Sequence, residues 1–126
     1  VGINEKSNYF LRKKKILGLF KKDIIVGKNK VKMITLSQFI KDNKINNIDI
    51  LKIDTEGSEF DVLKGLNDHD FKIIKFIFFE HHYDLMLKKN YKFSDINLFL
   101  IKKNFRLCFK NKMRFRKTFE YIYEKK

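Results

Sequence analysis

The sequence predicts an α/β fold whose sheet ends in two antiparallel strands and is preceded by an irregular β region. From residue 35 onward, the predicted elements run helix, strand, helix, strand, helix, strand, strand. Residues 73–79 are apolar except for Lys75, as expected of a strand buried on both faces of a parallel sheet. Residues 110–117 show no helical pattern, and so short a connection joins antiparallel strands.

The segment before residue 35 is predicted to be irregular β structure. Residues 8–11, 23–26 and 31–34 have the composition of strands. The Gly-Lys-Asn-Lys sequence at 27–30 is typical of a turn and is expected to join the last two strands.

The first helix is predicted to begin at Thr35. The Thr35 hydroxyl can cap the first turn, and Gln38, three residues later, can complete a capping box. The apolar face expected to turn inward consists of Leu36, Phe39 and Ile40.

A strand over residues 48–53 leads directly into a second helix. Ser58 and Asp61 form the start signal of this helix. Its predicted inward face consists of Phe60, Leu63 and Leu66. The Asp-His-Asp sequence at 68–70 fits no spacing of metal ligands and predicts a solvated turn.

Three further elements complete the sheet and its cover. Strand 73–79 leads through Glu80-His81-His82 to a helix over residues 94–103, for which Ser94 is the expected N-cap. Residues 105–109 and 118–123 have the composition of the last two strands.

Length and composition indicate one globular domain. A chain of 126 residues with 44% hydrophobic content can bury a sizeable core. The single cysteine, Cys108, cannot form an intramolecular disulfide, which predicts a reducing, cytoplasmic compartment. No apolar run reaches the length of a membrane span. Because the sequence opens at Val1 within what reads as a strand and turn, we expect it to be a fragment of a longer protein.

The formal net charge of +14 admits two interpretations. One is a nucleic-acid-binding or anion-binding module, because basic surfaces attract phosphate groups. The other is a solvated lysine surface without a specific partner. Only four of the 29 basic residues are arginine, which is the residue preferred for bidentate phosphate contacts. The low arginine content favours the second interpretation, in which there is no nucleic-acid partner. The binding module stays open as an alternative.

Four side chains at the ends of two predicted strands are the candidate catalytic residues. Asp54 and Glu56 follow one buried strand, and Glu80 and His82 share one face at the end of the next. If these strands are parallel neighbours, the four residues meet at the carboxyl edge, where open α/β sheets bind ligands. Carboxylates and histidine are the commonest proton-transfer groups near neutral pH.

Other roles are open to some of these residues. Glu56 could simply complement the positive end of the following helix. The carboxylates could also orient a substrate hydroxyl or bind a divalent metal, although we predict no metal site. His81 lies on the opposite face of the strand from His82 and is expected to be a surface or packing residue.

Residues 51–59, Leu-Lys-Ile-Asp-Thr-Glu-Gly-Ser-Glu, and the Val-Leu-Lys-Gly at 62–65 resemble the signature of the FkbM methyltransferase family. The usual form of that signature is L-K-I-D-V-E-G-A-E followed by E-V-L-x-G. Residues 31–39 resemble the preceding family segment V-x-x-x-T-L-D-x-F, with Ser37 in place of the acidic residue. Residues 79–82 resemble the F/V-E-x-H ending of the next strand.

The resemblance implies a fold and an activity. Family members are similar to class I S-adenosylmethionine-dependent methyltransferases, which have a Rossmann-like sheet of seven strands in the order 3-2-1-4-5-7-6. The four predicted strands from residue 48 onward would then be the fourth to seventh, in the order 4-5-7-6. The implied function is O-methylation, with S-adenosylmethionine as cofactor and a hydroxyl of a sugar, glycan or small natural product as acceptor. We expect Asp54 or His82 to be the base, and Glu56 and Glu80 to orient the acceptor or that base.

One part of the family pattern is missing from the sequence. The family's glycine-rich donor-binding loop follows its first strand, and an acidic residue that holds the donor ribose follows its second. Neither is found here, so residues 1–126 resemble a single partial domain, the C-terminal portion of a methyltransferase. No residue is assigned to the donor. An inactive gene remnant is a further alternative.

Overall fold

A computed structural model of the protein describes residues 8–12, 24–29, 31–83, 90–114 and 117–126, the first two ranges by their backbone alone. The chain divides into two compact units, Val1–Ile34 and Thr35–Lys126. Each unit is described by itself.

The first unit contains a two-stranded antiparallel sheet. Strand β1 (Asn8–Arg12) pairs with strand β2 (Ile24–Asn29), and the ladder is irregular between Tyr9 and Leu11. The β structure expected in this segment is therefore present, but its boundaries differ from the prediction.

The predicted turn at 27–30 and the predicted strand at 31–34 were wrong. Residues 27–29 continue β2, because Tyr9 of β1 lies opposite Lys28 and extends the ladder through the Gly-Lys-Asn sequence. Residues 31–34 form no regular structure. Local turn propensity was overridden here by a partner strand that lies elsewhere in the sequence.

The second unit is built on a mixed sheet of four strands. Their order across the sheet is β3-β4-β6-β5, with β3 parallel to β4 and the other two pairs antiparallel. The strands are β3 (Ile48–Ile53), β4 (Ile74–His82), β5 (Phe105–Lys112) and β6 (Thr118–Lys125). The predicted α/β class and the antiparallel final pair are thereby confirmed.

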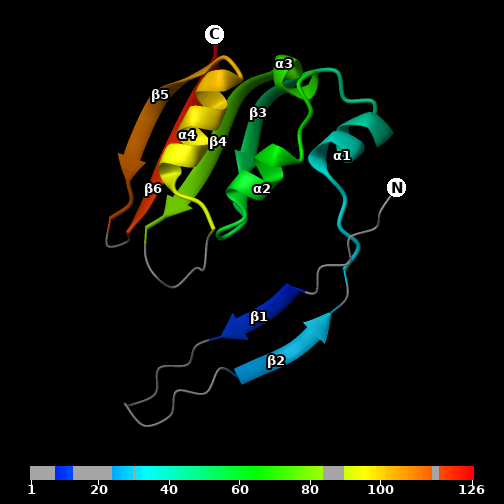
Figure 1. Ribbon diagram of the computed structural model, residues 1–126, viewed down its shortest axis with the longest axis vertical. Helices are drawn as coiled ribbons and strands as arrows, with labels where there is room; N and C mark the ends of the chain where they lie inside the picture. The colour runs from blue at the N-terminus through cyan, green and yellow to red at the C-terminus, as the bar shows by residue number, and fades with distance from the viewer. Residues whose placement is uncertain (1–7, 13–23, 30, 84–89, 115–116) are drawn as a thin grey trace. The chain divides into compact units, whose positions relative to one another are not determined.

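The described residues of this unit form four helices: α1 (Leu36–Asp42), α2 (Glu59–Lys64), α3 (Asp70–Ile73) and α4 (Phe93–Lys102). Figure 1 shows α2 and α4 lying over the same face of the sheet. In the part of the chain that the structure describes, no helix has the length and apolarity needed to cross a bilayer.

The start of α1 agrees with the prediction only in part. Thr35 is the N-cap, and its hydroxyl accepts a hydrogen bond from the Gln38 amide N–H. The Gln38 side chain does not close the predicted capping box but donates to Asp42 Oδ1 at 2.6 Å. Ile40 is buried as expected, whereas Phe39, predicted to face inward, has 46% of its surface exposed.

Helix α4 begins earlier than predicted. Its N-cap is Lys92 and not Ser94, because the Asp95 carboxylate accepts a hydrogen bond from the Lys92 backbone N–H at 2.7 Å. The acidic residue in the first turn therefore defines the start of the helix, as it does in a capping box.

The solvated turn predicted at 68–70 was wrong for Asp70. This residue is buried and opens the short helix α3. Its carboxylate accepts hydrogen bonds from the Ser37 hydroxyl and the Asn67 N–H, while the Asn67 side chain accepts one from the Asp70 N–H at 3.0 Å. These bonds join the first residue of α3 to Asn67 and to Ser37 of α1.

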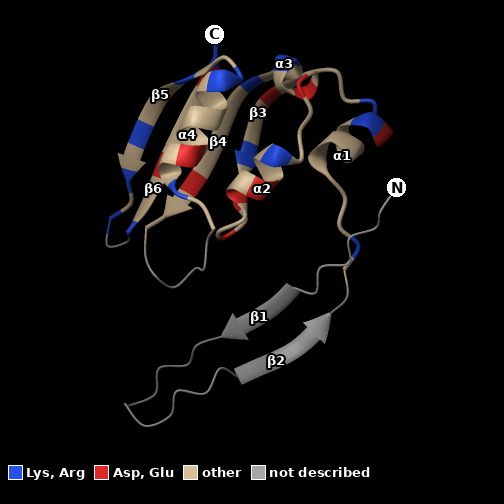
Figure 2. Cartoon of the chain, in the orientation of Figure 1, with Lys and Arg blue, Asp and Glu red and all other residues tan. Residues whose placement is uncertain are grey.

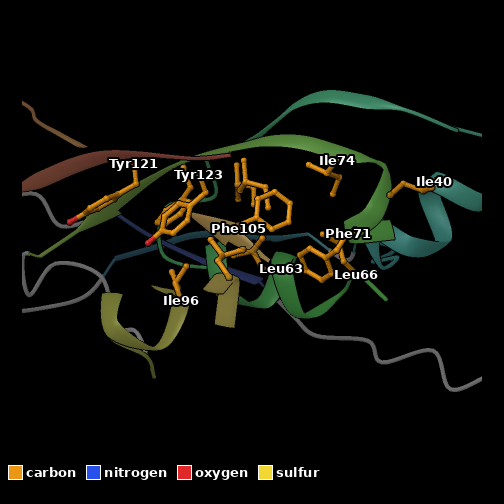
Figure 3. Close-up of a cluster of buried hydrophobic side chains, with 13 residues drawn as sticks. Ile40, Leu63, Leu66, Phe71, Ile74, Ile96, Phe105, Tyr121 and Tyr123 are labelled. Atoms are coloured by element: carbon orange, nitrogen blue, oxygen red, sulfur yellow. The ribbon is translucent and has the colours of Figure 1, made fainter. Parts of the chain in front are cut away.

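The core lies between the sheet and the helices on its covered face (Figure 3). Phe79 of β4 stacks against Tyr121 and Tyr123 of β6, with ring centroids 5.5 and 5.9 Å away. Aromatic pairs of this kind add to the free energy gained from burying their area. The buried hydrophobic residues are Ile40, Ile53, Leu63, Leu66, Phe71, Ile74, Ile77, Phe79, Ile96, Leu100, Phe105, Tyr121 and Tyr123.

Two isoleucines of this sheet should respond very differently to truncation. Ile77 is fully buried in β4, whereas 63% of the surface of Ile50 in β3 is exposed. Ile77→Ala is expected to lower the free energy of unfolding by about 2–5 kcal/mol, because it removes buried methyl groups and leaves a cavity. Ile50→Ala is expected to cost about 1 kcal/mol or less. Urea denaturation of both variants checks this, and equal losses would contradict the assigned faces of the sheet.

Candidate active site

The parallel pairing of β3 with β4 brings the predicted site residues to one edge of the sheet. Ile53, the last residue of β3, lies opposite Phe79 of β4. Asp54 and Glu80 each follow one of these partners, so both stand at the carboxyl edge. Figure 2 shows acidic segments at this end of β4 and at the start of α2.

Side chains alternate along β4 as the sequence predicted. His81 is buried and packs against the rings of Tyr83, Tyr91 and Phe93, so its predicted packing role is confirmed. In a strand the residues on either side of His81 point to the opposite face, so Glu80 and His82 share that face.

A tight turn after β3 carries Glu56 toward β4. Glu56 and Gly57 both have left-handed backbone conformations, with φ of 48° and 104°. Such values are rare for a residue with a Cβ atom, and Gly57 adopts them without steric cost. The turn places Glu56 Oε2 3.3 Å from His82 Nε2, so the structure brings these two predicted residues together.

His82 is held from both ring nitrogens. Nδ1 lies 2.9 Å from the Thr118 hydroxyl, and Nε2 faces Glu56. Only 8% of the His82 side chain is exposed, compared with 66% of the Glu56 side chain. The pair thus joins a buried imidazole to a carboxylate at the surface.

Asp54 and Glu80 are not part of this pair. The Asp54 carboxylate has 46% of its side-chain surface exposed and lies 3.7 Å from Lys52 Nζ. Glu80 is half-buried, stands opposite Glu120 of β6, and takes part in none of the ion pairs found among the described residues. All four predicted residues therefore lie at one edge, and the ion pair found among them joins Glu56 to His82.

Sequence reasoning missed a fifth residue, the buried Glu59. Its carboxylate accepts a hydrogen bond from the Gly57 N–H at 2.7 Å, a longer one from the Thr55 hydroxyl at 3.4 Å, and a third from the Tyr91 hydroxyl. A signal was present in the sequence, because Glu59 lies four and seven residues before Leu63 and Leu66 and therefore on their helix face.

The surroundings of Tyr91 favour its protonated form. Burial, followed by the hydrogen bond to the Glu59 carboxylate, raises the pKa of the Tyr91 phenol well above its ordinary value of 10.0. The phenol therefore stays protonated and keeps donating to Glu59 over the physiological pH range.

Across the described residues, no group of three or more histidine, cysteine, aspartate or glutamate side chains is arranged to hold a metal ion.

Comparison with known proteins defines the class of this protein. Residues 4–107 match the family model for the methyltransferase FkbM domain, which is more than half of the 126-residue chain. The protein is therefore a methyltransferase-domain protein, and it belongs to the FkbM methyltransferase family. It has no match among the curated proteins or the solved structures with which it was compared.

Alkaline pH should destabilise the second unit through the phenols of two buried tyrosines and of the half-buried Tyr91. Burial raises the pKa of Tyr91, Tyr121 and Tyr123 above the ordinary value of 10.0. Because folding favours the protonated form, their contribution to stability is complete below pH 10 and is lost as the pH rises above it. Phenolate absorbance recorded alongside circular dichroism should show these groups ionising together with unfolding. Ionisation of all the tyrosines near pH 10 with the fold intact would contradict this.

Proposed function

We propose that this protein is an O-methyltransferase that acts on a hydroxyl of a sugar, a glycan or a small natural product. Membership of the FkbM methyltransferase family supports the reaction class. The observation that supports a particular site is the position of four side chains at the carboxyl edge of β3 and β4. These are Asp54, Glu56, Glu80 and His82. Ligands bind at this edge in open α/β sheets.

Asp54 is the proposed general base. A sugar hydroxyl is a poor acid, so a carboxylate placed to take its proton as the oxygen attacks accelerates the reaction. The Asp54 carboxylate is partly open to solvent, and its nearest charged partner is Lys52. His82, the other candidate for this role, is nearly buried and has a polar side chain close to each ring nitrogen, which favours Asp54.

The Glu56–His82 pair is the proposed orienting element. Its exposed carboxylate can accept a hydrogen bond from a second hydroxyl of the acceptor, while the imidazole and Thr118 hold it in place. Orientation of this kind converts binding energy into rate, because it holds the attacking oxygen in a reactive geometry. Glu80, beside Asp54, can serve the same acceptor.

S-adenosylmethionine is the proposed methyl donor, as the family implies, and supplies an electrophilic methyl group when bound. The described residues do not fit the donor by themselves. The turn after β3 has a single glycine and two acidic residues, and no glycine-rich loop follows either parallel strand. No residue of this chain is therefore assigned to the donor.

The position of β3 suggests where a donor-binding segment would join. β3 is an edge strand of the four-stranded sheet, and in the expected seven-stranded scheme these strands would read 4-5-7-6. Under this proposal the first strand of the scheme, with its donor loop, pairs along the outer edge of β3. The single partial domain that the sequence predicts is consistent with this arrangement.

The proposed function is tested by label transfer. The chain, together with the donor-binding segment proposed to pair along β3, is incubated with S-adenosylmethionine that carries a tritiated methyl group and with panels of sugars, glycans and hydroxylated natural products. Label is expected in products whose methyl ether survives base treatment. Label found only in amines or carboxylate esters would contradict O-methylation.

Replacement of the proposed base should slow turnover. Asp54→Asn keeps the size of the side chain but removes its basicity, so kcat is expected to fall by about 10²–10⁴-fold. Asp49→Asn is the matched control, because Asp49 is an exposed aspartate within β3, the strand that Asp54 follows, and lies away from the carboxyl edge. Unchanged turnover of Asp54→Asn would remove Asp54 from the mechanism.

A further inference from the structure

We propose that Glu59 is a positioning residue that holds the turn after β3 so that Glu56 meets His82, and that Tyr91 in turn holds Glu59. The inference rests on the proposed function only in the purpose that it assigns to the Glu56–His82 pair. It adds Glu59 and Tyr91 to the candidate site as supporting residues that are not proposed to act as acid or base.

The burial of Glu59 is the first observation. Only 1% of this glutamate is exposed, although a buried carboxylate is costly unless its oxygens are hydrogen-bonded. Oε1 accepts from the Gly57 N–H at 2.7 Å and from the Thr55 hydroxyl at 3.4 Å, and Oε2 accepts from the Tyr91 hydroxyl. All three donors are neutral groups. The buried carboxylate is therefore stabilised by hydrogen bonds and not by an ion pair with any of these donors.

The strain of the turn is the second observation. Glu56 has φ of 48°, a conformation that a residue with a Cβ atom leaves readily unless its surroundings hold it. The next residue, Gly57, is anchored through its N–H to Glu59. Fixing the Gly57 amide fixes the peptide plane that follows Glu56, and with it the direction in which the Glu56 side chain leaves the backbone. That direction leads to His82 Nε2, 3.3 Å from the Glu56 carboxylate.

The position of Tyr91 in the chain is the third observation. Tyr91 lies 32 residues beyond Glu59, just before α4 and in the connection that follows β4. Its hydrogen bond therefore joins the connection after β3 to the connection after β4. In open α/β sheets these connections carry the ligand-binding residues, so this one bond sets their relative position at the site.

The test uses nuclear magnetic resonance signals of the full chain without donor or acceptor. The chain has only three histidines, so the His82 ring signals can be assigned. In Glu59→Gln and in Tyr91→Phe, the Gly57 amide proton is expected to lose the downfield shift of a bond to a carboxylate. The His82 ring signals are expected to move toward those of Glu56→Gln.

A double-mutant comparison separates positioning from a general structural effect. If Glu59 acts through Glu56, the change that Glu59→Gln causes at the His82 ring disappears when Glu56 is already glutamine. A purely structural effect would move the His82 signals equally in both backgrounds. Tyr91→Phe, the milder change, carries the same comparison if Glu59→Gln does not fold.

Tyr123→Phe is the matched control. It removes the hydroxyl of another tyrosine of the second unit, the buried Tyr123, which donates to Asn97 Oδ1 at 2.6 Å, away from the turn. This variant is expected to lose stability while the Gly57 amide and His82 ring signals stay in place.

Two results would overturn the inference: His82 signals that do not move in either variant, and His82 signals that move to the same extent with and without the Glu56 carboxylate. Failure of methyl transfer by the unaltered protein together with its donor-binding segment would instead overturn the proposed function. The two failures are distinguishable, because the spectra require neither activity nor substrate. If the chain is active, Tyr91→Phe is expected to lower kcat with KM little changed.

Discussion

The parallel pairing of β3 with β4 is the constraint on which the carboxyl edge depends. Its register sets Ile53 opposite Phe79, so Asp54 and Glu80 emerge side by side. Because side chains alternate along a strand, a slip of one residue would turn every side chain of β4 to the other face. The same slip would bring His81 to the face that His82 occupies, and it would expose Phe79. Core packing and site geometry therefore demand the same register.

Two kinds of interaction support that edge from the covered face of the sheet. Stacked rings of Phe79, Tyr121 and Tyr123 hold β4 against β6, and the hydrogen bonds of Glu59 close the turn beyond β3. The rings contribute buried apolar surface, and the carboxylate fixes the orientation of the turn, because hydrogen bonds specify angles that apolar contacts leave free. A buried acid that makes no contact with a substrate can in this way be part of a binding edge.

Periodicity and local signals predicted the parts of this structure that depend on near neighbours. The alternation along β4 was enough to place Glu80 and His82 on one face and His81 on the other. The extent of β2 was not predictable in this way, because Gly27 reads as a turn until Tyr9 of β1 pairs beside it. The role of Glu59 was not predicted, for a related reason. Its position marks it as inward-facing, but the Tyr91 hydroxyl that makes its burial tolerable comes from a distant part of the chain.

The left-handed backbone of Glu56 has a consequence for how this position can be probed or can vary. Alanine there would alter two properties at once, because it deletes the acid and keeps a Cβ in a conformation that alanine disfavours. Glutamine separates the two, since it retains the shape of the side chain and loses only the charge. Glycine or asparagine would relax the main chain and delete the acid. Relatives that carry either residue at this site would thus preserve the bend while forgoing its chemistry.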